Sequence, residues 1–205
     1  FRLLHKYFPQ HKILTTFQMT QEFAQRENIV ILPMDLYYNW DDKNDLKNAY
    51  EDVAKAEEYV KGKKINLSKY DELVLQCDLI LDVSGDMWGD NAEHVGHQRF
   101  LVDCLKMRAA QLLGVKTVLY AVTPGPFEKV DDRELALNVF TAFSLVVIRE
   151  KLSQNNLEKW GFPTEHVIWA PCPSFLFEAN KSYKSEWTEK IENTHKNNRK
   201  AIGIT

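Results

Sequence analysis

The sequence has few cysteines, and nothing in their arrangement suggests pairing. Cys77, Cys104 and Cys172 are the only three in 205 residues, and no CxxC motif occurs. Disulfide-stapled domains need an even set of cysteines, and zinc knuckles need closely spaced pairs. The cysteine content therefore predicts neither a disulfide framework nor a zinc knuckle, and it favours a reducing cytoplasm.

Long apolar runs and an excess of basic charge are also missing. Apolar stretches such as residues 144–148 are far shorter than the roughly 20 residues that a membrane-spanning helix needs. The formal net charge is −3, so no basic field surrounds the whole chain to attract nucleic acid or anionic lipid. We expect neither a membrane-spanning segment nor a nucleic-acid partner.

The histidines lack the spacing of a metal site. None of the six forms an HxxxH or HExxH pattern. His94 and His97 are three residues apart and would share one helical face, but exposed surface histidines are the simpler interpretation. We therefore expect no metal ion.

An ordinary globular composition and a regular alternation of segments are present. Apolar residues make up 44% of the chain and charged residues 27%, which is typical of a chain with a packed core. Short β-branched runs alternate with longer amphipathic stretches. This alternation predicts βαβ units and an α/β fold, with a Rossmann-like parallel sheet and helices on both faces.

The expected elements follow each other along the whole chain. The predicted strands are 12–17, 28–32, 78–84, 116–123, 144–148, 166–170 and 201–205. The predicted helices are 20–26, 45–61, a helix that Ser68 caps, 98–113, 131–143, 151–160 and 186–198. Gly114 and Gly161 are expected to end the helices before them, because glycine readily takes a left-handed conformation.

The predicted strand at 201–205 bears on the domain organisation. A terminal strand without a following helix would leave one face or edge of a parallel sheet uncovered. We therefore expect residues 1–200 to form an N-terminal Rossmann-like domain that lacks its first residues. Residues 201–205 would begin a second Rossmann-like domain.

Polar loops follow four of the predicted strands, at 84–90, 123–127, 149–153 and 171–175. Ligands bind at the carboxyl ends of parallel strands, and right-handed crossovers bring these ends to one edge of the sheet. We expect the four loops to meet there and to form half of an anion-accepting cleft.

The first two loops are rich in glycine. Gly85 and Gly89 flank Asp86 and Trp88, which would let the backbone approach a ligand and offer amide groups to an anion. A tight turn with a buried tryptophan is an equally good interpretation. Gly125 lies between two prolines and predicts a rigid bend, for which a stiff connector is a simpler interpretation than direct ligand contact.

Arg149 is the charged residue that directly ends a predicted strand. A guanidinium beside the N-terminus of the next helix suits a carboxylate or a phosphate. A salt bridge with Glu150 or Asp86 would explain the same arginine equally well. The residue types leave both interpretations open.

Four segments, in this order and spacing, resemble the polysaccharide pyruvyl transferase family. They are DLILDVSGDMWGD at 78–90, LLGVKTVLYAVTPGPF at 112–127, VIREKLS at 147–153 and LEKWG at 157–161. The likeness covers about residues 78–177, which is half of the chain. It implies one half of a GT-B-like enzyme with two Rossmann-type domains and an active site between them.

The resemblance also implies a reaction. Members move a pyruvyl group from phosphoenolpyruvate to sugar hydroxyls of a cell-surface polysaccharide or its precursor. A small-molecule donor and a glycan acceptor would then be the partners, and phosphoenolpyruvate would be a co-substrate with no further cofactor. A homo-oligomer is compatible with the sequence.

By the same resemblance, Arg149 would contact the anionic donor. Ser84 to Asp86 match the glycine-rich loop of the family, Gly125 and Pro126 its Gly-Pro turn, and Arg149 with Ser153 its Arg-acid-x-x-Ser motif. No catalytic residue is assigned, because the family's basic and histidine-bearing motifs for donor binding and proton transfer lie in its second domain. The expected substrate-binding residues are Ser84, Gly85, Asp86, Trp88, Thr123, Gly125, Pro126, Arg149 and Ser153.

Two other functions remain compatible with the sequence. The family usually has consecutive glycines where this chain has Ser84 to Asp86, and commonly Asp-Pro where it has Cys172 and Pro173. A GT-B-type glycosyltransferase or sugar epimerase that uses a nucleotide sugar would share the architecture, since a fold does not determine a function. A catalytically inactive relative that binds glycans is the non-enzymatic alternative.

Overall fold

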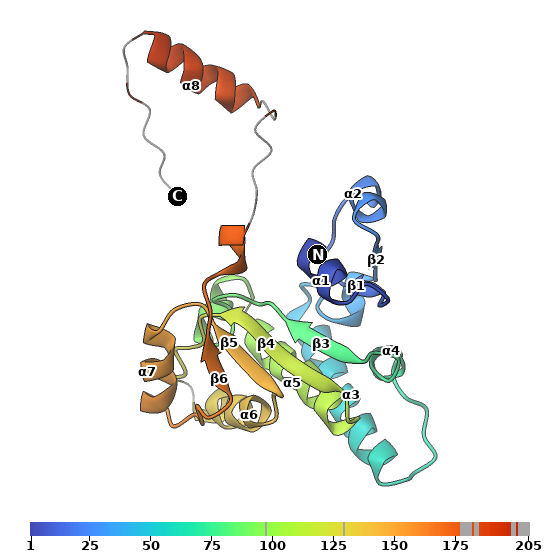
Figure 1. Cartoon of the computed structure of the whole chain (residues 1–205). Helices are drawn as coiled ribbons and strands as arrows, with labels where there is room; N and C mark the ends of the chain where they lie inside the picture. The colour runs from blue at the N-terminus through green and yellow to red at the C-terminus, as the bar shows by residue number, and fades with distance from the viewer. Residues whose placement is uncertain (97, 129, 177–181, 183–184, 198–199, 201–205) are drawn as a thin grey trace. The chain divides into compact units, whose positions relative to one another are not determined.

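The computed structural model describes residues 1–96, 98–128, 130–176, 182, 185–197 and 200 (Figure 1). The chain divides into two compact units, Phe1–Cys172 and Pro173–Thr205. Each unit is described by itself.

The first unit opens with a small βαβ segment. Its elements are α1 (Arg2–Tyr7), β1 (Ile13–Thr15), α2 (Gln21–Arg26) and β2 (Ile29–Ile31). The two strands pair in parallel and form a two-stranded sheet of their own. Both strands and α2 were predicted from the sequence, whereas α1 was not.

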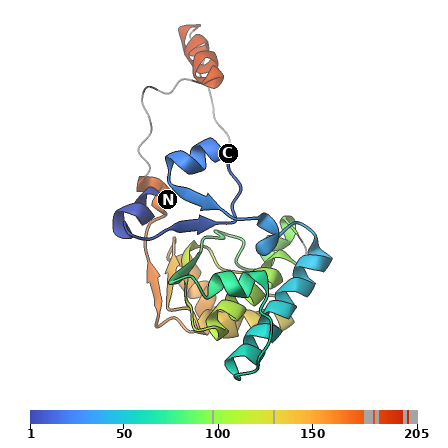
Figure 2. The same cartoon turned by 90° about the vertical axis from the view of Figure 1, so that its right-hand side faces the viewer.

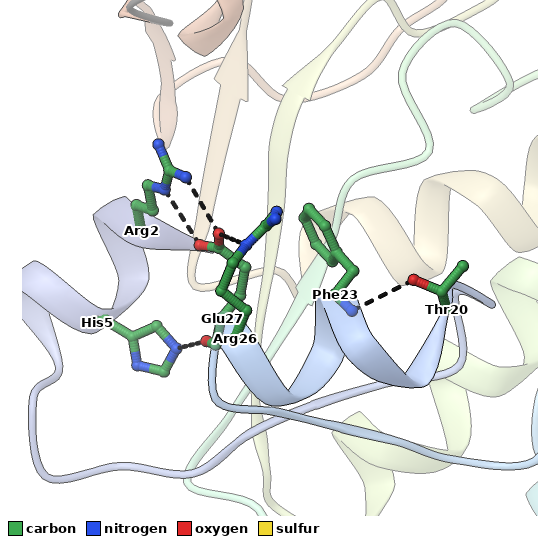
Figure 3. A network of polar contacts seen from close by, with 6 residues as sticks. All are labelled: Arg2, His5, Thr20, Phe23, Arg26 and Glu27. Carbon is green, nitrogen blue, oxygen red and sulfur yellow. Dashed lines mark hydrogen bonds and ion pairs between the residues drawn. The ribbon is translucent and has the colours of Figure 1, made fainter. Parts of the chain in front are cut away.

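Polar contacts tie α1 to the end of α2 (Figure 3). Arg2 donates two hydrogen bonds of 3.1 Å to the carboxylate of Glu27. His5 Nε2 lies 2.7 Å from the Glu27 carbonyl oxygen, and the side chain of Thr20 caps α2 by accepting the N–H of Phe23. The hydrogen bond from Arg2 lowers the pKa of the Glu27 carboxyl.

Helices lead from this segment to the main sheet. They are η1 (Met34–Leu36), α3 (Asp42–Val60) and α4 (Lys69–Val74). The Ser68 side chain accepts the N–H of Asp71 at 3.0 Å, so the predicted cap of α4 is confirmed. Helix α3 packs against α5 (Arg99–Leu112) (Figure 2).

The main sheet has four parallel strands in sequential order: β3 (Leu79–Asp82), β4 (Lys116–Val122), β5 (Leu145–Ile148) and β6 (Val167–Trp169). The connections contain η2 (Asp90–His94) and α5, then α6 (Val130–Thr141), then α7 (Leu152–Lys159). Each crossover moves to the next strand in the same direction, so right-handed connections place α5, α6 and α7 on one face. The predicted α/β class, with parallel sheets flanked by helices, is confirmed.

The largest core cluster joins that face of the sheet to these helices. It contains Leu119, Val146 and Ile148 of the strands with Met107 of α5, Phe140 of α6 and Leu157 of α7. On the opposite face, Leu81, Val118 and Tyr120 are only partly buried. Ile168 on that face is 50% exposed.

Glycines end two of the helices as predicted. Gly114 follows α5 with φ +82° and Gly161 follows α7 with φ +78°. Up to Lys196, every predicted strand and helix has a counterpart within a few residues. The 3-10 helices were not predicted, and the predicted strand at 201–205 lies outside the described residues.

The second unit contains η3 (Pro173–Leu176) and α8 (Glu186–Lys196). Ser185 and Thr188 form a capping box at the start of α8. Neither element has a buried residue. None of the helices in the described part of the chain combines the length and the apolar content that crossing a membrane requires.

Candidate functional site

The loops that follow β3, β4 and β5 meet at the carboxyl end of the main sheet. The N–H of Thr123 donates to the Gly85 carbonyl at 2.8 Å, and the N–H of Gly125 donates to the Trp88 carbonyl at 2.8 Å. The N–H of Arg149 donates to the Val122 carbonyl at 3.2 Å. The predicted meeting of these three loops is therefore confirmed, and it is made by backbone hydrogen bonds.

Gly89 and Gly125 allow the first two loops to touch. Gly89 has φ +149°, and a Cβ built on it would lie 2.7 Å from the Gly125 Cα. No other residue fits there without moving the backbone. Asp90 adds to the contact, because its N–H donates to the Pro126 carbonyl at 2.9 Å and its Oδ2 accepts the N–H of Glu128 at 2.6 Å. Gly89 belongs to the site although the predicted substrate-binding set omits it.

A chain of side-chain hydrogen bonds links the second and third loops. Arg149 Nε donates to Thr123 Oγ1 at 2.7 Å, and Thr123 Oγ1 donates to Glu150 Oε2 at 3.0 Å. The Ser153 hydroxyl donates to Glu150 Oε1. Thr123, Arg149 and Ser153 were predicted as site residues. Glu150 was considered only as a salt-bridge partner, although its place between an arginine and a serine of one motif was a signal.

Two nitrogen atoms of the Arg149 guanidinium remain available as hydrogen-bond donors. Its Nε lies 3.8 Å from Glu150 Oε2, so the predicted salt bridge with Glu150 is present; among the described residues Arg149 makes no ion pair with Asp86. No hydrogen bond or ion pair of the described residues uses Nη1 or Nη2, and the Arg149 side chain is 31% exposed. A Cβ built on Gly85 would lie 3.8 Å from Nη1. The unused donors therefore lie beside the glycine turn, where an anion would meet them.

Asp86 lies on the exposed side of the first loop. It lines a cavity of about 410 Å³ with Met87, Asn91, His94 and Val95. His94 is exposed and His97 lies outside the described residues. No group of three metal-ligating side chains occurs in the described part of the chain. Pro126, at the second loop, is exposed as well.

Trp88 and Ser153 lie beneath the surface of the site and are not exposed at it. Trp88 is fully buried, and Ser153 is 1% exposed. The indole stacks edge-on or tilted against the rings of Phe100, Phe127, Phe140, Phe143 and Phe162. A tight turn with a buried tryptophan therefore describes this loop, and Trp88 holds it to the core from below.

A buried polar cluster lies beneath the first loop, and the sequence analysis did not single it out. Asp82 ends β3, and its Oδ1 accepts the N–H of Ser84 at 2.8 Å. Burial, followed by the charge of Asp103, raises the pKa of Asp82 well above its ordinary value. Arg99 and Asp103 are one helical turn apart in α5 and lie among apolar residues of its first turns, and this charged pair was the available signal.

The fourth predicted loop, 171–175, crosses the division between the two units. Its place at the rim, with Cys172 and Pro173, stays a prediction.

Comparison with known proteins agrees with the resemblance. The model of one protein family, described as polysaccharide pyruvyl transferase, matches residues 2–204. This match extends well beyond the residues 78–177 that carry the resemblance. No curated protein and no solved structure matches the chain.

Proposed function

Because the chain belongs to the polysaccharide pyruvyl transferase family, we propose that it contributes contacts to the anionic donor in an enzyme that uses phosphoenolpyruvate. The acceptor would be the hydroxyls of a sugar in a cell-surface polysaccharide or its precursor. The meeting of the glycine turn, the Gly-Pro turn and Arg149 at one edge of the sheet is the observation that carries this proposal.

The chemistry of the donor suits this edge. Phosphoenolpyruvate carries a carboxylate and a phosphate, and both accept hydrogen bonds from a guanidinium. Thr123 Oγ1 accepts the hydrogen bond of Arg149 Nε, which leaves Nη1 and Nη2 for phosphoenolpyruvate. Gly85 has no side chain to occupy the space beside them. Preorganised donors of this kind orient a substrate and stabilise the charge that develops on it.

The proposed reaction joins both acceptor hydroxyls to one carbon. A general acid protonates C3 of the enol, and a sugar hydroxyl attacks C2 and loses its proton. A second hydroxyl then attacks C2 as the C2–O bond to phosphate breaks; its proton passes to the departing phosphate, and the cyclic ketal closes. The residues of this chain would bind and orient the donor, and the general acid stays unassigned. No cofactor besides the co-substrate is required.

Replacing Arg149 tests the donor site. In the full-length protein, Arg149→Ala should weaken phosphoenolpyruvate binding by about 10- to 100-fold, because it removes charge-assisted hydrogen bonds. Binding is measured by the ligand-dependent rise in melting temperature and by calorimetric titration. Arg149→Lys should recover only part of the affinity, since an ammonium does not reproduce the guanidinium fork.

Lys151→Ala is the matched control. Lys151 lies two residues away, and its ammonium contacts the ring of Trp169 at 5.1 Å. This variant removes the same charge from the same loop and should bind the donor as the wild type does. Equal affinity of Arg149→Ala and wild type would exclude the proposed role, and stabilisation by nucleotide sugars instead would favour a glycosyltransferase or epimerase.

We also propose a cytoplasmic location. The three cysteines are few and widely spaced and form no CxxC motif, which supports a reducing compartment.

A further inference from the structure

Two carboxyl groups from distant parts of the chain face each other beneath the first loop of the site. Asp82 is 6% exposed and Asp103, on α5, is 3% exposed. Asp82 lies on the face of β3 that points towards α5, and Asp103 is close enough to raise the pKa of Asp82, after burial does. Asp82 also adjoins the turn that starts at Ser84, because its Oδ1 accepts the Ser84 N–H.

The other oxygens of both groups already have partners. Asp82 Oδ1 accepts the N–H of Ser84 at 2.8 Å. Asp103 Oδ1 accepts the hydroxyl of Tyr37 and lies 3.5 Å from Arg99 Nη1. Oδ2 of Asp82 and Oδ2 of Asp103 are buried, and no N–H or hydroxyl group among the described residues donates to either.

A proton held between the two carboxyl groups would give both of these buried oxygens a hydrogen-bond partner. Two ionised carboxylates in contact and out of water repel each other strongly, so one of them retains a proton. One cation, Arg99, faces the pair and balances one negative charge. Desolvation, and then Asp103, raises the pKa of Tyr37, so the phenol facing the pair stays neutral.

We propose that Asp82 and Asp103 share one proton, and that Asp82 in this pair is a positioning residue for the turn at Ser84–Asp86. Oδ1 of Asp82 holds the Ser84 amide, while the shared proton keeps Oδ2 bound to Asp103. The positioning role rests on the proposed function, since it assumes that this turn borders the donor. The shared proton does not depend on the reaction.

The pair makes the stability of the protein depend on pH in a defined direction. Burial raises the pKa of Asp82 in the folded chain, so the folded state holds a proton that the unfolded state has lost at neutral pH. Its contribution to stability is complete below the ordinary pKa of an aspartate, about 4, and is lost as pH rises towards the folded-state pKa. Once the proton is gone, repulsion would push Asp82 from Asp103 and release Ser84.

Asp82→Asn is the decisive variant. The asparagine Oδ1 can still accept the Ser84 N–H, and its Nδ2 can donate to Asp103 without a titratable proton. Denaturant unfolding between pH 5 and pH 9, followed by tryptophan fluorescence, measures the difference from wild type. We expect wild type to lose stability relative to Asp82→Asn as pH rises. The slope of its unfolding free energy against pH should correspond to the release of up to about one proton on unfolding.

Two further variants complete the stability experiment. Asp82→Ala should be destabilised at every pH and should shift the NMR signal of the Ser84 amide, which Asp82→Asn keeps near its wild-type position. Asp45→Asn is the control. Asp45 is also buried, at 4% exposed, and accepts the N–H groups of Asn39 and Asp41 at 2.9 and 3.0 Å. Asp45→Asn should keep the wild-type loss of stability at high pH.

Two results would overturn the shared proton. One is an Asp82→Asn variant as unstable as Asp82→Ala at pH 7. The other is a difference between wild type and Asp82→Asn that does not change with pH.

Phosphoenolpyruvate binding tests the positioning role separately. Asp82→Asn should rescue most of the donor affinity that Asp82→Ala loses, and should hold that affinity to higher pH than wild type. If the stability profiles behave as expected but none of the Asp82 variants alters donor affinity, the positioning role is wrong and the shared proton stands. If wild type does not bind phosphoenolpyruvate at all, the proposed function fails instead.

Discussion

At the scale of single residues, buried charged groups between α3, α4 and α5 form a second site at which stability depends on pH. Lys106 Nζ lies 2.6 Å from Asp52 Oδ2 and donates to the Leu36 carbonyl at 2.8 Å. Asp71 is fully buried beside this pair, and neither of its carboxyl oxygens has a hydrogen-bond partner among the described residues. Burial and the charge of Asp52 raise the pKa of Asp71 to about 6.

Replacing Asp71 with asparagine should stabilise the protein at neutral pH. The raised pKa means that the contribution of Asp71 is complete below about pH 4 and is lost as pH rises through about 6. Above that range the folded chain holds a buried charge that Ser68 and Lys106 offset only in part, so Asp71→Asn should gain about 1–3 kcal/mol. Urea unfolding at pH 7 and pH 4 measures the difference, which should nearly vanish at pH 4. A variant less stable than wild type at pH 7 would contradict this prediction.

At the scale of elements, the close approach of Gly89 to Gly125 joins the loop after β3 to the loop after β4. Gly89 and Gly125 meet too closely for a side chain on Gly89, and Trp88 beside them is buried in the aromatic core. The rim of the site and the core beneath it are therefore coupled through Trp88 and Gly89. A substitution at Gly89 should therefore perturb both the site loops and the core.

Gly89→Ala tests this coupling against Gly114→Ala. Both glycines have positive φ, but a Cβ on Gly114 would meet nothing within 4 Å. Gly114→Ala should cost about 1–2 kcal/mol from backbone strain alone. Gly89→Ala should cost about 1–3 kcal/mol more, because the loops must separate. It should also shift tryptophan fluorescence and weaken donor binding, and equal effects of the two changes would argue against a close contact in solution.

At the scale of the whole molecule, the core belongs to the first unit. The three hydrophobic clusters draw all their residues from Phe1–Cys172. Four parallel strands in sequential order place the crossover helices on one face, and this face carries the largest cluster. The site loops are thus anchored in the largest cluster, which contains Trp88 and Phe127 of these loops.

A chain that ends at Cys172 should therefore fold on its own. It keeps every residue of the three clusters, so thermal unfolding followed by circular dichroism should remain a single cooperative transition. The buried contribution to tryptophan emission should be retained, because Trp88 is fully buried in this unit, whereas Trp40 and Trp169 are exposed. A broad transition with loss of the buried contribution would show that residues 173–205 complete the fold.

Most elements of the fold were predictable from the sequence, because their signals are local. Alternating β-branched and amphipathic runs predicted β3 to β6 and α5 to α7, and Gly114 and Ser68 marked helix ends. The short helix α1 was missed because its stabilising contacts come from Glu27, far along the chain. Loop residues such as Thr123 and Arg149 were predicted as neighbours because parallel strands end at one edge.

The sequence by itself determined the order and type of the elements and the residues that follow each strand, because hydrophobic period and turn chemistry are properties of neighbouring residues. Only the tertiary structure decided that Gly89 meets Gly125, that Trp88 lies in the core and that Asp82 faces Asp103. These contacts join residues far apart in the chain. They depend on how the strands and helices pack, which no local pattern encodes.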